Sequence, residues 1–93
     1  MTIGVLYLDF LVPDARSLKD KRRVIKGLKD RMRARFNCSV AEIEYQDVWT
    51  RCRLAACVLS GDSQHANTQL NEIASFAERQ FGAELADYRI EML

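Results

Sequence analysis

Hydrophobic and polar residues alternate along four segments of the chain, and this period of two predicts four β-strands. The segments are residues 3–12, 38–45, 50–60 and 84–92. In the first of them, Leu6, Leu8 and Phe10 fall on one face. A short polar connection joins the second and third segments, which is typical of a β-hairpin.

Two further segments repeat their apolar residues every three or four positions, as amphipathic helices do. The first helix is predicted to begin at Ser17, a good N-cap that Asp20 supports three residues later, and to end near Asn37. The second follows a turn at residues 61–63 and is predicted to reach about Phe81, which helical spacing places on its apolar stripe.

The predicted order is therefore strand, helix, strand, strand, helix, strand. Short connections and right-handed crossovers favour an α+β, ferredoxin-like βαββαβ fold. Its four-stranded antiparallel sheet carries both helices on one face, with the second and fourth strands at the edges. We expect residues 1–93 to form this single domain.

The hairpin also has a predicted register. If it turns at residues 47–48, Glu44 lies opposite Arg51 and Glu42 lies opposite Arg53. Two opposite-charge pairs on one face would stabilise that pairing. The alternate residues of both strands would then form the apolar face under the helices.

Composition places the chain among ordinary globular proteins, with 48% hydrophobic and 29% charged residues. Its apolar runs are far shorter than the ~20 residues of a membrane-spanning helix, and we expect neither a signal peptide nor a membrane partner. The three cysteines, Cys38, Cys52 and Cys57, are an odd number without tight spacing. This pattern predicts reduced thiols in the cytoplasm rather than disulfides.

Charge is strongly segregated along the chain. Ten of the fourteen basic residues lie between Arg16 and Arg35, opposed only by Asp20 and Asp30, which gives this window a net charge of 10 − 2 = +8. The remaining residues carry four arginines and eleven acids, a net charge of 4 − 11 = −7. A concentrated cationic surface of this kind favours polyanionic partners.

With the apolar stripe of the first helix on the sheet, most of these cations face outward. The candidate RNA- or anion-binding residues are Lys19, Arg22, Arg23, Lys26 and Arg33, with Lys29 and Arg16 auxiliary. Lys21 and Arg35 lie near the stripe, and we expect their charged ends to reach solvent. The alternative interpretation is a helix face that charge merely keeps soluble. Like charges at i,i+4 spacing repel, so such a one-sided face indicates a use for the charge.

The block SLKDKRRVIKGLKDR at residues 17–31 resembles the YlxP-like family of small bacterial proteins, as do residues 36–37, 39–42, 46–47 and 49. Cys38 departs from the family, in which an aliphatic residue is expected at this position. The resemblance covers essentially the whole chain. It implies a ferredoxin-like fold in the bacterial cytosol, with genes that often neighbour those of translation-initiation and ribosome-maturation factors. It implies no catalytic residues, because none are established for the family.

No combination of residues predicts an enzyme. The chain has no recognisable nucleophile–base arrangement and no glycine-rich phosphate loop. His65 is the only histidine and has no cysteine cluster beside it, so no metal site is expected. No cofactor is expected either.

The open face of the sheet is the alternative interaction surface. Its candidate dimer residues are Val5, Tyr7, Ala55, Cys57 and Leu59. The third strand lacks the stacking rings of RNA-recognition modules, which favours pairing with a second copy of the chain. Trp49, near a strand end, is interpreted as a lid on the core.

These observations predict a non-catalytic accessory protein that binds structured RNA or a ribosomal particle through its basic helix. The alternative is a homo-oligomeric regulatory or small-ligand-binding module that pairs through the open sheet face.

Overall fold

The computed structural model describes residues 1–93 and has the predicted element order. The strands are β1 (Thr2–Leu11), β2 (Ser39–Glu44), β3 (Arg51–Ser60) and β4 (Glu84–Met92). The helices are α1 (Leu18–Arg35) and α2 (Ser63–Glu78). The strands form one antiparallel sheet in the order β2-β3-β1-β4. The predicted ferredoxin-like fold is therefore confirmed, with β2 and β4 at the edges.

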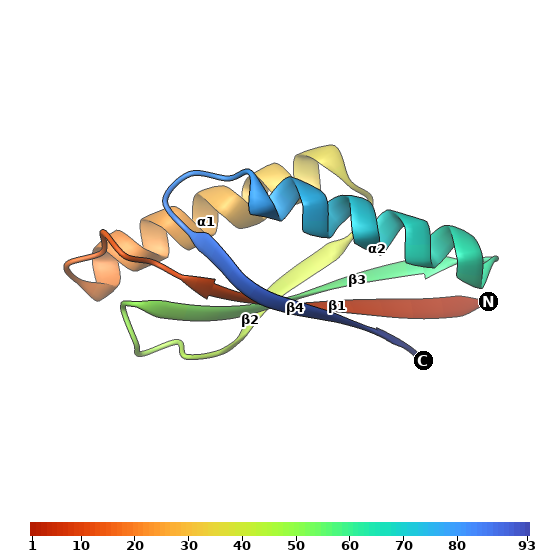
Figure 1. Cartoon of the computed structure of the whole chain (residues 1–93), viewed down its shortest axis with the longest axis horizontal. Helices are drawn as coiled ribbons and strands as arrows, with labels where there is room; N and C mark the ends of the chain where they lie inside the picture. The colour runs from red at the N-terminus through yellow and green to blue at the C-terminus, as the bar shows by residue number, and fades with distance from the viewer.

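Both helices lie on the same side of the sheet, as the edge-on view in Figure 1 shows. The core fills the space between these two layers. Its largest side chains from the sheet are Leu6, Leu8, Phe10 and Leu54, and those from the helices are Leu28, Met32, Leu70 and Ile73. The period of two in the strands and the period of three to four in the helices direct these residues inward.

The ends of α1 follow from local hydrogen bonds. The Ser17 hydroxyl accepts a hydrogen bond from the Asp20 backbone N–H at 3.1 Å, as an N-cap should. The Asp20 carboxylate accepts in turn from the Arg16 N–H at 3.1 Å. Ile25, Leu28 and Met32 then face the core, which turns the opposite face of α1 toward solvent.

The end of α2 differs from the prediction. The helix stops at Glu78, and Phe81 is 94% exposed instead of lying on the buried stripe. The Gln80 side chain donates to the Phe76 carbonyl at 3.1 Å and satisfies one of the last helical acceptors. Gly82 has φ +87°, a left-handed conformation that redirects the chain toward β4.

The predicted hairpin register is wrong by one residue at Glu42 and by two residues at Glu44. A β-bulge between Glu42 and Glu44 places Glu42 opposite Leu54 and Glu44 opposite Arg53. Because successive side chains of a strand point to opposite faces, this insertion moves Glu42 to the helix-covered side. Glu44 stays on the open side, where it forms an ion pair with Arg53.

Candidate nucleic-acid interface

The basic residues predicted as a binding surface lie on the side of α1 that faces away from the sheet. Six of the seven side chains are exposed, namely Arg16, Lys19, Arg22, Arg23, Lys26 and Arg33. The seventh, Lys29, is half-buried at the border of the apolar stripe. The helix period and the buried stripe together explain this arrangement.

Four of the seven converge on one concave surface. A groove of about 400 Å³ runs beside α1 toward edge strand β2 and is lined by Arg22, Lys26, Lys29 and Arg33 together with Ile25, Asp30 and Glu42. We call it the basic groove. Arg23 lines a separate hollow near Asp20 and Gly82. Lys19 and Arg16 line neither, so the structure divides the predicted site.

Asp30 offsets part of the charge in the basic groove. Its carboxylate lies 2.7 Å from the Lys26 ammonium and 3.6 Å from the Arg33 guanidinium. The hydrogen bond from Lys26 lowers the pKa of Asp30, so this carboxylate is ionised at neutral pH. Arg33 also donates to the Val40 carbonyl of β2 at 2.8 Å, which anchors its side chain across the groove.

The other cations of this surface have no acidic partner. The protein contains six ion pairs, and none involves Lys19, Arg22, Arg23 or Lys29. Glu42, the second acid of the basic groove, is paired with Lys21. Because Lys21 neutralises Glu42, only the carboxylate of Asp30 counts against the four cations of the lining. The net charge of the groove is then 4 − 1 = +3. The basic groove therefore retains a substantial uncompensated positive charge.

Lys21 contradicts the prediction that its charged end reaches solvent. Its side chain is only 1% exposed, and the ammonium lies 2.8 Å from Glu42 Oε2. The ammonium also donates to the Tyr45 carbonyl at 2.5 Å. Glu42 Oε2 has no other partner, and the contact is ionic rather than a well-directed hydrogen bond. Lys21 thus ties α1 to edge strand β2 and is not available to a ligand.

The residues predicted for a dimer face do share the open side of the sheet. Val5 pairs with Cys57, and Tyr7 pairs with Ala55, on the central strands β1 and β3. Leu59 continues this patch and is 65% exposed. Both helices lie on the other side of the sheet, so no element of this chain covers the patch.

A polar network that the sequence pattern did not predict adjoins this patch. Arg53 forms ion pairs with Asp9, at 2.6 Å, and with Glu44. The Arg89 guanidinium lies 3.9 Å from the centre of the Tyr7 ring, so that ring is already covered by a cation.

The interpretation of Trp49 as a lid on the core is wrong, because its side chain is 47% exposed in the β2–β3 connection.

None of the three cysteines lines the basic groove. All three cysteines are free, and burial raises the pKa of the Cys52 thiol far above its usual value. No three His, Cys, Asp or Glu side chains come together as a set that could hold a metal ion. Neither helix is long and apolar enough to cross a membrane.

Comparisons with known proteins find similar sequences and a similar structure. The family model described as "Protein of unknown function (DUF503)" matches residues 3–90. Uncharacterized protein YlxP of Bacillus subtilis (strain 168) is 33% identical over 76 residues, which are 82% of this chain and 83% of that protein. Among solved structures, the de novo designed protein Ferredog-Diesel is similar with a TM-score of 0.48 and 18% identity, covering 98% of this chain and 84% of the designed one. None of these descriptions names an activity.

Proposed function

Because this chain belongs to the DUF503 family of proteins of unknown function, the YlxP-like family that its sequence resembles, we propose its function from its own geometry. It is a non-catalytic accessory protein that binds structured RNA through the basic groove. The observation that carries the proposal is the convergence of four cations on one concave surface. Of the two acids there, Glu42 is neutralised by Lys21, and only Asp30 draws on the charge of these four cations.

Electrostatics explains why RNA suits this groove. Arg22 and Lys26, and likewise Lys29 and Arg33, stand four residues apart and repel one another by about 0.2–0.5 kcal/mol per pair. Phosphates placed between them relieve this repulsion and release condensed counterions. Such contacts position an RNA without reading its sequence. Structured RNA of a ribosome or its precursor is the target that the family's gene neighbourhood favours.

Reversing two of these charges tests the proposal. Arg22→Glu with Lys29→Glu removes two phosphate contacts, which lowers the log–log salt slope of RNA binding by about 2 and the affinity at 0.1 M salt about 50-fold. The helix itself should not suffer, because the new glutamates stand four residues before Lys26 and Arg33 and form favourable pairs with them. The measurement is a filter-binding titration against ribosomal RNA at rising salt, with thermal unfolding in parallel.

Two further variants make this test specific. Arg51→Glu with Arg89→Glu removes the same charge from the open sheet face and should leave the salt slope unchanged. Asp30→Asn removes the acid that pairs with Lys26 and Arg33 in the basic groove. It should strengthen binding about threefold, the Coulomb energy of one charge at ~6 Å in water. Equal losses in both double variants would show that only net charge matters, and the proposed site would be abandoned.

One observation favours a second candidate function, a homodimer that pairs through the open sheet face. The central strands place Val5, Cys57 and Leu59 together on a side that no element covers. Uncovered apolar patches mark association sites when they are large enough. In this candidate the RNA affinity is absent, and the paired sheets hold a regulatory ligand.

Cysteine alkylation distinguishes the two candidates. Cys57 lies within the patch, whereas Cys38 lies just before β2 and serves as an internal control. A monomer should alkylate Cys57 at a rate that does not depend on protein concentration. A dimer should protect Cys57, but not Cys38, as the concentration rises, and mass spectrometry of the two peptides measures both rates. Protection of Cys57 together with sedimentation as a salt-insensitive dimer would favour the second candidate.

A further inference from the structure

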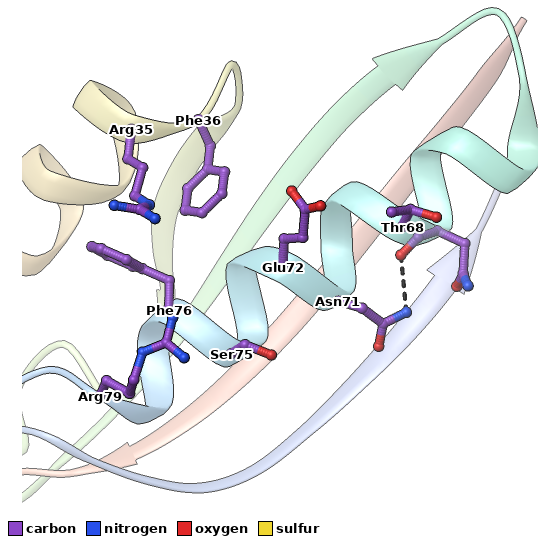
Figure 2. Close-up of a pocket in the computed structure, with 9 residues that line it drawn as sticks. Arg35, Phe36, Thr68, Asn71, Glu72, Ser75, Phe76 and Arg79 are labelled. Atoms are coloured by element: carbon purple, nitrogen blue, oxygen red, sulfur yellow. Dashed lines mark hydrogen bonds between the residues drawn. The ribbon is translucent and has the colours of Figure 1, made fainter.

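A second groove lies on the other side of α1, between its C-terminal end and α2. We call it the aromatic groove, and Figure 2 shows the side chains that line it. Its volume is about 410 Å³, within the range of small-molecule sites. Its lining residues are Arg35, Phe36, Asn67, Thr68, Asn71, Glu72, Ser75, Phe76 and Arg79. The basic groove contains none of these residues, so the two sites can be tested separately.

Two aromatic rings and a guanidinium form one end of this groove. The Phe36 and Phe76 rings meet edge to face, with 5.5 Å between their centroids and an interplanar angle of 80°. The Arg35 guanidinium carbon lies 5.4 Å from the centre of the Phe76 ring and 5.9 Å from that of Phe36. Both rings are only half-buried, and Figure 2 shows Arg35 directed toward Phe76. Planar groups of this kind are platforms on which a nucleobase stacks.

The side of the groove along α2 carries hydrogen-bonding groups. Asn71 donates its amide to the Asn67 carbonyl at 2.9 Å, which leaves its own amide oxygen directed elsewhere, as Figure 2 shows. Ser75 and Glu72 are exposed on the same helix, and Glu72 has no ion-pair partner. Amide, hydroxyl and carboxylate groups match the donors and acceptors on the edges of an unpaired base.

Charge indicates which planar ligand is suited to this groove. Arg35 and Arg79 supply two cations against the single carboxylate of Glu72, so the lining favours an anion attached to the planar group. A nucleotide combines a π-face, polar edges and a phosphate. Arg33 and Arg35 belong to the last turn of α1 yet line different grooves, so one RNA chain that crosses this turn contacts both.

We propose that the aromatic groove holds an unpaired nucleotide of the RNA whose structured part lies in the basic groove. This inference rests on the proposed function and adds to it a preference for RNA with an unpaired segment beside a helix. The base stacks against Arg35 and Phe76, its edge faces Asn71 and Glu72, and Arg79 contacts the phosphate.

The test compares a blunt 12-base-pair RNA duplex with the same duplex extended by four unpaired nucleotides, one of them 2-aminopurine. The extension should raise affinity about tenfold, the effect of stacking one base, and stacking should quench the 2-aminopurine fluorescence. Phe76→Leu should abolish both effects without changing the affinity for the blunt duplex. Ser75→Glu, at an exposed helix position that cannot disturb the core, should do the same by adding a negative charge to the groove.

Gln64→Glu is the matched control, because it adds the same charge to α2 outside the groove and should change nothing. If the extension adds no affinity, or if its effect survives Ser75→Glu, the inference is overturned. The proposed function is still tested separately, by binding of the blunt duplex to Arg22→Glu with Lys29→Glu. If neither RNA binds at low salt, the proposed function is overturned and the inference with it. Retention of the extension's effect in the Arg22→Glu, Lys29→Glu variant would support the inference on its own.

Discussion

Replacing Lys21 by methionine is expected to lower the free energy of unfolding by about 3–5 kcal/mol, the cost of leaving a buried charge without its partner. The ammonium is the sole partner of Glu42 Oε2, an atom with no access to solvent. The Tyr45 carbonyl is less affected, because it also accepts the Val48 N–H at 3.0 Å. For a chain of this size the loss corresponds to a fall in Tm of roughly 12–40 °C. Urea unfolding of both proteins measures it.

A double variant separates the buried charge from simple loss of packing. Lys21→Met with Glu42→Met replaces both partners by apolar side chains of similar length, and such replacements are often neutral or stabilising. We therefore expect the double variant to unfold within about 1 kcal/mol of the parent protein, although each single variant is strongly destabilised. A double variant as unstable as Lys21→Met alone would show that the cost lies in shape rather than in charge.

This ion pair also bears on the basic groove, because Glu42 lines it. With Lys21 present, the carboxylate is compensated and the groove keeps its net positive charge. The pair therefore neutralises Glu42, the one acid that β2 contributes to the basic groove. In the Lys21→Met variant the folded fraction should bind RNA more weakly than the parent, which measurements in stabilising osmolyte can detect.

The fold could be predicted because its determinants are periodic. Each strand and helix buries one face, so alternation and helical spacing identify the elements without knowledge of their neighbours. The same reasoning placed Arg22, Lys26 and Arg33 on the outward side of α1, where they lie. A buried stripe fixes the opposite face of a helix by geometry alone.

The remaining features depend on contacts that no period encodes. A single inserted residue in β2 moved Glu42 under the helices, and only that position gives Lys21 a buried partner. Helical spacing assigned Phe81 to the stripe of α2, but the helix ends earlier and exposes it. The aromatic groove was missed because Phe36 and Phe76 belong to different helices, and their meeting depends on how α1 and α2 pack.

Leu28→Ala is expected to lower stability and to leave RNA binding intact, whereas the charge reversal in the basic groove should do the reverse. Leu28 is 1% exposed and attaches α1 to the core, so its truncation should lower the free energy of unfolding by about 2–5 kcal/mol. It removes no side chain from either groove. Once corrected for the folded fraction, the RNA affinity and salt slope of Leu28→Ala should therefore equal those of the parent protein. Arg22→Glu with Lys29→Glu should instead reduce binding and leave stability intact.

The measurement combines urea unfolding with RNA titration on the same Leu28→Ala sample. Because the midpoint of urea unfolding shifts while its slope stays constant, the folded fraction at each titration point follows directly. A loss of salt slope in Leu28→Ala would mean that the cations act only when the core holds α1 rigidly. That result would contradict the expectation that exposed charges on the folded helix are sufficient for binding. Unchanged binding would place the function in the exposed charges, with the core serving only to hold the helix that presents them.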